Sequence, residues 1–472
     1  MIPVTMFAGR DVAVQGLGLS GLAAARALKA GGANPILWDD QASARDGAAA
    51  QGFAVSDLAA ADWPRFAALV LAPGIPLTQP EPHWSVTRAR AAGVEVIGDM
   101  ELFFRERALA RAPGKIVVIT GTNGKSTTTA LTAHLLAAAG KRVALGGNIG
   151  KAVLDLEPFA PDLTYVIELS SFQIELAPGI SPDAAALLNI TPDHLDRHGT
   201  LQNYARIKSS IFARLGAGAT AVIGIDDEPS RAIAGRLAGP FAVQRIAVGR
   251  PVETGIYVTD GVLHEMEGGG ELAHIDLAGI GSLRGAHNWQ NAAAAYALAR
   301  SQGVTADAIV PGLKSFAGLS HRMEQVARRG KVLFVNDSKA TNADAAGKAL
   351  ASFSDIYWII GGRPKEGGLA GLEPFFPKIA RAYLIGEAAE AFAGQLGNRV
   401  DHVPCGTLER AVALAAEDAG RSAAKEPVVL LSPACASYDQ FDNFAKRGDA
   451  FRDLVMTLDG AEGVKPEQGQ AA

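Results

Sequence analysis

Residues 115–140, KIVVITGTNGKSTTTALTAHLLAAAG, decide the fold of this chain. The stretch opens with KIVVIT, an apolar run rich in β-branched residues that predicts a buried strand. The glycine-rich loop GTNGKS follows at 121–126 and leads into TTTALTAHLLAAAG, whose alanines and leucines favour a helix. A strand joined to a helix through such a loop is typical of phosphate binding, because the loop N–H groups and the helix N-terminus hold phosphate oxygens.

The loop also carries the two side chains that this chemistry needs. Lys125 would reach the β- and γ-phosphates of a nucleotide, and the Ser126 hydroxyl would bind Mg²⁺. Ile119 stands where the usual pattern G-x-x-x-x-G-K-[ST] has its first glycine, so we interpret the loop as a shorter variant. The residues that we predict to bind the nucleotide here are Gly121, Thr122, Asn123, Gly124, Lys125, Ser126 and Thr127.

On both sides of this stretch, short apolar runs alternate with alanine-rich segments of helical period. Such alternation predicts βαβ units and parallel sheets, which is an α/β fold. The length of 472 residues suggests about three domains, and the breakers Pro113 and Gly114 mark one boundary. We predict a Rossmann-like domain at 1–98, a central parallel-sheet domain with the phosphate-binding loop at 99–318, a second Rossmann-like domain at 319–460 and a disordered polar tail at 461–472.

The composition excludes several classes of protein. A formal net charge of −5 argues against general binding to nucleic acids or to anionic membranes. No uninterrupted apolar run is long enough to span a membrane and no signal peptide is evident, so we expect no membrane insertion. The two cysteines, Cys405 and Cys435, exclude a disulfide scaffold and a cysteine-based zinc site. They fit a reducing compartment, and we expect a cytoplasmic protein.

A second glycine-rich turn lies near the N-terminus. GLGLSG at 16–21 follows an apolar strand and precedes an alanine-rich helix, and Asp39 and Asp40 come about 20 residues later. This is the G-x-G-x-x-G arrangement, in which a diphosphate approaches bare backbone N–H groups. From the residues alone, the turn either binds a diphosphate-linked nucleotide, NAD among them, or is a tight turn without a ligand.

Polar residues follow several other predicted strands. Glu168 ends the strand TYVIE, where it would either bind nucleotide-bound Mg²⁺ or lie in solvent. His194, in the cluster PDHLDRH, could bind a metal, whereas Lys208 on its own is an ordinary lysine on a helix. The strands VLFVN, IYWIIG and VVLL all lead into glycines, hydroxyls and cations, and we interpret their ends as one ligand crevice.

Eight segments together resemble the Mur ligases: GTNGKSTTT, GGNIG, IELSSFQIE, NITPDHLDRH, GAHNWQN, LSHRME, NDSKATN and SPACASYDQFDNFAKRG. The resemblance covers nearly the whole chain in order, and the last two segments resemble the D-glutamate-adding branch of that family. The D-N-P-[RK] motif of the lysine-adding and diaminopimelate-adding branches does not occur in the sequence. The spacer between His194 and Lys208 is one residue shorter than in the best-known members.

The resemblance implies an ATP-dependent ligase that joins D-glutamate to UDP-N-acetylmuramoyl-L-alanine through an acyl phosphate and yields ADP and phosphate. It implies a place in peptidoglycan precursor synthesis, and so in cell wall biogenesis, cell shape and cell division. It also implies two Mg²⁺ sites and a carbamylated Lys208, and it makes the first glycine-rich turn a UDP site. We expect a monomer that binds no nucleic acid.

The resemblance assigns roles to individual residues as well. The groups that it implies for catalysis are Lys125, Lys208, His194 and Glu168, and those that it implies for the metal are Ser126, Glu168, His194 and Lys208. The further nucleotide contacts that it implies are Asn291, Arg322 and Asp337. The substrate contacts that it implies are Leu19, Ser20 and Asp39 for UDP, Asn148, and Thr341, Lys365, Ser437, Tyr438 and Phe444 for D-glutamate.

The sequence leaves three alternatives open. The first is another ligase of the same superfamily, such as the L-alanine-adding enzyme or folylpolyglutamate synthase, although the latter lacks a leading UDP-binding domain. The second is an NAD-dependent dehydrogenase built on Gly16, Gly18 and Gly21, which would leave the GKS loop without a purpose. The third is a nucleotide switch or scaffold that binds ATP without turnover.

Overall fold

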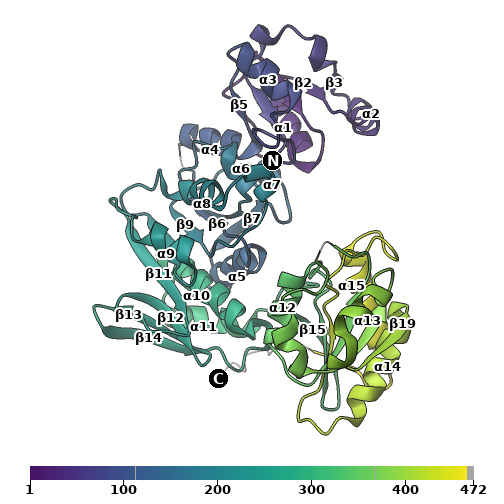
Figure 1. The fold of residues 1–472 in the computed structure, drawn as a ribbon. Coiled ribbons are helices and arrows are strands. Elements are labelled where there is room, and N and C mark those ends of the chain that lie inside the picture. Colours follow the sequence, from purple (N-terminus) through teal and green to yellow (C-terminus); the bar gives the residue numbers. More distant parts are fainter. Residues whose placement is uncertain (112, 366, 465–472) are drawn as a thin grey trace. The chain divides into compact units, whose positions relative to one another are not determined.

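A computed structural model describes residues 1–111, 113–365 and 367–464 of the chain (Figure 1). These residues contain three β-sheets and form two compact units. The first unit comprises Met1–Ile275 with Gln290–Gly312, and the second comprises Asp276–Trp289 with the described residues from Leu313 onward. Helices and strands alternate along the chain, and most neighbouring strands in the sheets are parallel, which confirms the predicted α/β class.

The first sheet has the strand order β3-β2-β1-β4-β5, and all of its neighbouring strands are parallel. The chain runs outward from β1 to β2 and β3 and then returns to the other side of β1 with β4. The carboxyl ends of β1 and β4 therefore form the crevice where such sheets bind ligands. The elements are β1 (Asp11–Gln15), α1 (Leu19–Ala30), β2 (Asn34–Trp38), α2 (Ala42–Ala50), β3 (Ala54–Val55), β4 (Leu69–Leu71), α3 (Trp84–Ala91) and β5 (Val96–Ile97).

The second sheet has the order β14-β13-β12-β11-β10-β9-β6-β8-β7. The strands from β7 across to β12 are parallel, and β13 pairs antiparallel with β12. The strands are β6 (Lys115–Thr120), β7 (Arg142–Gly147), β8 (Leu163–Glu168), β9 (Ala184–Leu187), β10 (Thr220–Gly224), β11 (Ala242–Val248), β12 (Gly255–Thr259), β13 (Val262–Glu267) and β14 (Gly270–Asp276). The helices of this part are α4 (Asp99–Leu109), α5 (Lys125–Ala138), α6 (Ser171–Glu175), α7 (Leu195–His198), α8 (Leu201–Ser209), α9 (Glu228–Ala234), α10 (Ala286–Ser301) and α11 (Ala306–Ser315).

The third sheet has the order β19-β18-β17-β20-β16-β15-β21, with the five strands from β19 to β16 parallel. Side chains of α12 and α13 pack into the apolar cluster on one face, and those of α14 and α15 pack into the cluster on the other. The strands are β15 (Glu324–Arg329), β16 (Val332–Asn336), β17 (Ile356–Gly361), β18 (Ile379–Ile385), β19 (His402–Gly406), β20 (Val428–Leu431) and β21 (Glu462–Gly463). The helices are α12 (Ala343–Ala351), α13 (Ala389–Leu396), α14 (Leu408–Arg421) and α15 (Phe444–Met456).

The C-terminal segment differs in part from the prediction of a disordered tail at 461–472. Glu462 and Gly463 form β21, which pairs antiparallel with Arg328 and Ala327 of β15. Without β21, β15 would be the edge strand of this sheet and its outer backbone groups would be unpaired. A short polar segment can therefore pair with β15 although it has no apolar face to bury. Residues 465–472 lie outside the described residues. Within the described part of the chain, no helix is long and apolar enough to cross a membrane.

Candidate active site

The phosphate-binding loop between β6 and α5 has the backbone that its glycines predict. Gly124 adopts the left-handed conformation with φ of 85° just before α5, which side chains rarely tolerate. A Cβ atom at this position would lie 2.2 Å from Asn291 Oδ1. Asn189 holds the loop from the strand β9 side, since its Oδ1 accepts from Asn123 N at 2.9 Å and its Nδ2 donates to Asn123 O at 3.2 Å.

The ammonium group of Lys125 is held by the loop itself. Lys125 Nζ donates to Gly121 O at 3.0 Å and to Thr122 O at 2.8 Å. These neutral carbonyls are weaker partners for an ammonium than phosphate oxygens are. The lysine is thus kept at the loop in a position from which a bound phosphate can recruit it.

Glu168 ends β8, the neighbour of β6, and its side chain is only 1% exposed. Glu168 Oε1 accepts from Asn148 Nδ2 at 2.7 Å. Its other oxygen, Oε2, is buried and has no hydrogen-bond partner among the described residues. An unpaired buried carboxylate oxygen is costly unless a cation or a donor joins it, so the donor set fits a divalent cation. The alternative of a solvated strand-end glutamate is wrong.

Lys208 is also buried, at 1% exposure, although α8 is amphipathic and its other cation, Arg206, is exposed. Its Nζ donates to Gly121 O at 2.9 Å and lies 3.4 Å from Thr120 Oγ1, so that it reaches the start of the phosphate-binding loop. Burial, helped by the nearby charge of Lys125, lowers the pKa of Lys208 well below its usual value. The interpretation of Lys208 as an ordinary surface lysine is therefore wrong.

His194 lies in the loop before α7 and is half-exposed. It adopts a left-handed conformation with φ of 52°, and its ring meets the edge of Phe172 with centroids 4.9 Å apart. His194 Nε2 lies 3.4 Å from Asp193 Oδ2. Among the described residues, no three Asp, Glu, His or Cys side chains cluster closely enough to hold a metal alone. A metal here would need oxygens from a bound nucleotide or water, as Mg²⁺ commonly does.

Asp39 braces the first glycine-rich turn, at the carboxyl end of β1. Asp39 Oδ2 accepts from Leu17 N at 2.7 Å, and its Oδ1 accepts from Gln41 N at 2.9 Å. Leu19 is 82% exposed at the start of α1. An exposed apolar side chain at the N-terminus of a helix suits a ligand with a flat apolar part and a diphosphate.

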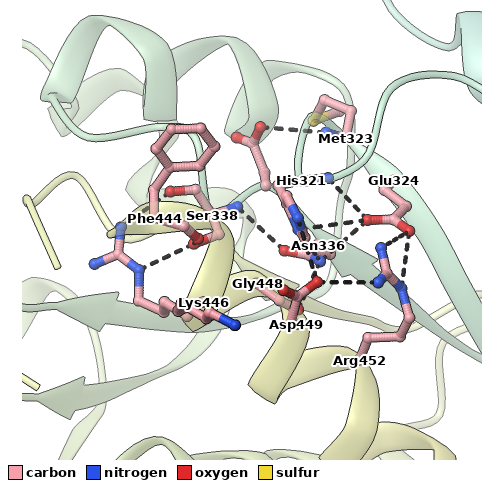
Figure 2. A network of polar contacts seen from close by, with 12 residues as sticks. His321, Met323, Glu324, Asn336, Ser338, Phe444, Lys446, Gly448, Asp449 and Arg452 are labelled. Carbon is pink, nitrogen blue, oxygen red and sulfur yellow. Dashed lines mark hydrogen bonds and ion pairs between the residues drawn. The ribbon is translucent and has the colours of Figure 1, made fainter. Parts of the chain in front are cut away.

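In the third sheet, the predicted crevice residues gather where β16 and β20 end. Asp337 is buried and accepts from Ser432 Oγ at 2.8 Å and from Met323 N at 3.2 Å. Burial raises the pKa of Asp337 to about 7. Figure 2 shows the adjoining network, in which Asn336 Nδ2 contacts His321 Nδ1, Glu324 Oε2 and Gly448 O at 3.0–3.1 Å. This network ties the segment before β15 to α15.

Comparisons with known proteins agree with this picture. The family model of the Mur ligase middle domain matches residues 119–299, and that of the Mur ligase, glutamate ligase domain matches residues 321–435. The chain is 56% identical over 474 residues to a UDP-N-acetylmuramoylalanine–D-glutamate ligase of Brucella suis, with 100% of both chains covered. The chain belongs to the Mur ligases. It is also 57% identical over 472 residues to the ligase of that name from Brucella abortus, with 99% and 100% covered.

Solved structures extend the similarity to the fold of Mur ligases. A UDP-N-acetylmuramate–alanine ligase from Thermotoga maritima superposes with a TM-score of 0.56 at 18% identity, covering 94% of this chain and 98% of that one. A UDP-N-acetylmuramoyl-L-alanyl-D-glutamate–2,6-diaminopimelate ligase gives 0.54 at 20% identity, covering 83% and 93%. At these identities the superpositions show the shared fold alone.

The structure of this Mur ligase brings only some of the predicted residues together. In the first unit, Lys125 and Lys208 both contact Gly121 O, and Asn148 contacts Glu168. In the second unit, Lys339 Nζ lies 3.8 Å from the centre of the Phe444 ring. Ser437 is buried, whereas Tyr438 is 66% exposed and Lys365 is exposed. Three of the residues predicted for D-glutamate thus differ widely in their exposure to solvent.

Sequence reasoning missed Arg447, which lies beside the predicted crevice residues of the second unit. Its guanidinium is fully buried in α15 and donates to Ser338 O at 2.9 Å and Cys435 O at 3.0 Å. Ser338 Oγ in turn donates to Phe444 O at 2.8 Å. Desolvation lowers the pKa of Arg447 to about 10. A buried cation bonded to carbonyls holds the loops after β16 and β20 together, and the motif FAKRG gave no local sign of that.

Proposed function

We propose that this Mur ligase joins D-glutamate to UDP-N-acetylmuramoyl-L-alanine, using ATP, in peptidoglycan precursor synthesis. The observation that carries the proposal is the identity of 56–57% over the whole length to ligases that bear this activity in their name. The phosphate-binding loop with Lys125 supports ATP as the energy source. Such a reaction uses ATP and a UDP-sugar, which are cytosolic compounds, so we expect a cytoplasmic protein. This localisation stays a prediction, and so does the expectation of a monomer.

The chemistry follows from the poor electrophilicity of a carboxylate. A carboxylate oxygen of UDP-N-acetylmuramoyl-L-alanine attacks the γ-phosphorus of ATP, and the bond to the ADP oxygen breaks. The resulting acyl phosphate is attacked at carbon by the amine of D-glutamate. The tetrahedral intermediate then loses a proton and expels phosphate, which leaves the amide. Lys125 stabilises the charge that spreads over the γ-phosphoryl oxygens.

The residues around the loop are suited to hold the cation that this chemistry uses. Bound Mg²⁺ neutralises charge on the nucleotide phosphates and so makes phosphoryl transfer easier. The partnerless oxygen of Glu168 is the strongest support for a site. Ser126 and His194 would hold the ions together with the nucleotide, and a carbamate on Lys208 would supply a further oxygen ligand.

The carbamate on Lys208 is supported by the protonation state that burial imposes. A neutral amine, with its lone pair free, attacks the carbon of CO₂ and loses a proton to form the carbamate, whereas an ammonium ion cannot. The lowered pKa of Lys208 keeps the amine available. We expect Lys208→Ala to abolish most of the activity and short carboxylates such as acetate to restore part of it. Full activity of the variant without bicarbonate would exclude this role.

Substrate contacts are proposed for both units. In the first unit, Leu19, Ser20 and Asp39 contact the uridine diphosphate, and Asn148 contacts the substrate beside Glu168. The exposed Leu19 and the turn braced by Asp39 support this assignment. In the second unit, the groups proposed for D-glutamate are Thr341, Lys365, Ser437, Tyr438 and the backbone near Phe444, and those proposed for the nucleotide are Arg322 and Asp337.

A phosphate-release assay tests the function directly. Protein with ATP, Mg²⁺ and UDP-N-acetylmuramoyl-L-alanine should release phosphate when D-glutamate is added, and not with L-glutamate, L-alanine or diaminopimelate. Lys125→Ala should lower kcat by about two to three orders of magnitude, the usual loss for a charge-stabilising group. Lys141→Ala, between α5 and β7, is the matched control. Release with another amino acid, or none with D-glutamate, would refute the proposal.

A further inference from the structure

Arg197 in α7 connects two loops that are far apart in the sequence. Its Nη1 donates to Gly74 O at 2.9 Å, and its Nη2 donates to Ile75 O at 3.1 Å. The planar guanidinium thus donates to two consecutive carbonyls of the loop 72–77, which follows β4. Both elements belong to the first compact unit. The hydrogen bonds of the Arg197 side chain thus go to backbone carbonyls of this loop.

Aromatic contacts hold Arg197 on the other side. Its guanidinium lies 4.6 Å from the centre of the Phe172 ring, in α6. The same ring meets His194 at 4.9 Å and stacks on His198 at 5.2 Å. Phe172 follows closely after Glu168 in the sequence, and α6 is anchored by a capping box at Ser170. Arg197 is therefore fixed against the same ring that positions His194.

The loop gripped by Arg197 packs against the first glycine-rich turn. Ala72 N donates to Gln15 O at 2.9 Å. A Cβ atom on Gly16 would lie 2.6 Å from Ala72 Cβ and 2.7 Å from Ile75 Cδ1. The contact is therefore so close that only glycine fits. Because Gly16 is packed against Ala72 and Ile75, movement of the loop 72–77 would also displace the turn that precedes α1.

We propose that Arg197 is a positioning residue that fastens the loop 72–77, and through it the turn 16–21, to the loop that carries His194. Arg197 itself touches none of the reacting atoms. It makes the binding of the uridine diphosphate and the order of the His194 loop depend on each other. The assignment of the turn 16–21 to UDP rests on the proposed function, whereas the mechanical link between the loops rests on the contacts alone.

The test compares Arg197→Met and Arg197→Lys with Arg206→Met. Arg206 is an exposed arginine of α8 whose side chain bonds to Asn203 within the same helix. In Arg197→Met we expect amide exchange at 72–77 and 16–21 to rise by about tenfold or more, since two charge-assisted hydrogen bonds are lost. UDP affinity in calorimetry, and 1/KM for the UDP substrate, should each fall by about tenfold. KM for D-glutamate should not change.

For Arg197→Lys, we expect amide exchange and UDP affinity between those of the wild type and those of Arg197→Met, because an ammonium cannot donate to both carbonyls with the fork geometry of a guanidinium. It also provides a folded variant if the methionine variant fails to fold. Unchanged exchange at 72–77, or unchanged UDP affinity despite faster exchange, would overturn the proposal. Exchange and calorimetry require no turnover, so they test the link between the loops even if the wild-type protein releases no phosphate and the proposed ligase activity itself fails.

Discussion

At the scale of single residues, the site depends on buried charged and titratable groups that lack the usual ion-pair partner. Glu168 keeps a buried oxygen without a partner among the described residues, Lys208 is bonded to a carbonyl and a hydroxyl, and Arg447 is bonded to carbonyls and a serine. Each costs free energy of folding, because burial disfavours a charge that is not fully compensated. Such groups gain when a ligand of the right charge arrives, which is why buried groups of this kind are common at binding sites.

Asp337 should make the stability of the second unit depend on pH. Because its folded pKa is raised to about 7, the folded state holds a proton that the unfolded state has already lost. Its contribution is present below the unfolded pKa and is lost as pH rises through 7, at up to about 1.4 kcal/mol per pH unit. We expect the stability of the wild type relative to Asp337→Asn to fall between pH 4.5 and 7.5. Urea unfolding at several pH values measures the free energy of unfolding of both proteins. A difference between the two free energies that does not vary with pH would contradict the expectation.

At the scale of elements, two helices depend on glycines that let another segment approach closely. Gly124 precedes α5 beside Asn291, and Gly448 lies in α15 beside the His321 ring. In each case the glycine is placed at a contact between segments distant in the sequence. The chain offers a matched glycine for each, in a similar backbone setting but with open space around it, so that the effect of the contact can be isolated.

Gly124→Ala should weaken both folding and nucleotide binding. Its Cβ would lie 2.2 Å from Asn291 Oδ1, and φ is 85°. Gly140, after α5, has φ of 78°, and a Cβ atom added there would meet nothing within 4 Å. Both substitutions carry the backbone strain of about 1 kcal/mol, and only the first also displaces Asn291. We expect a clearly larger loss of thermal stability and of ATP affinity for Gly124→Ala. Equal losses for the two variants would argue against the contact.

Gly448→Ala should destabilise the second unit, whereas Gly420→Ala should stabilise it. The first Cβ would lie 2.2 Å from His321 Nδ1, within the network of Figure 2. The second would lie in open space on α14, where alanine is favoured over glycine by about 0.5–1 kcal/mol. Denaturant unfolding of the two variants should therefore shift in opposite directions. A shift in the same direction would show that α15 can move away from His321 at little cost.

At the scale of the whole molecule, the proposed ligand sites lie in two different compact units. The glycine-rich turns at 16–21 and 121–126 belong to the first unit, and the crevice at the ends of β16 and β20 belongs to the second. Each unit has apolar clusters of its own: one spans the first and second sheets, and another covers a face of the third sheet. A ligand that binds one unit should thus slow amide exchange in the loops of that unit, even when the ligands of the other unit are absent.

UDP alone should slow amide exchange at residues 16–21 and leave residues 444–448 unchanged. The reason is that a diphosphate pairs with loop N–H groups at the end of β1, whereas α15 belongs to the other unit. Uridine, which has no diphosphate, is the control and should give much less protection at 16–21. Equal protection by uridine would show that the turn does not bind the diphosphate, and protection confined to 444–448 would place UDP in the wrong unit.

The sequence by itself determined the α/β class and the phosphate-binding loop, because these depend on neighbours along the chain. The strand, glycines, Lys125 and helix are contiguous, so their spacing is sufficient to predict the loop. Family resemblance added the predicted role of Lys208, which local rules alone could not assign. Cys405 and Cys435 are both buried and do not form a disulfide with each other.

Only the tertiary structure decided which distant groups meet. Lys208 contacts Gly121, 87 residues away, Arg447 contacts Ser338 across 109 residues, and Arg197 reaches Gly74 across 123 residues. Burial in such contacts, and not residue type, makes Lys208 a weak base and leaves an oxygen of Glu168 unpaired. Local patterns cannot predict this, because desolvation depends on packing by segments that the sequence places far apart.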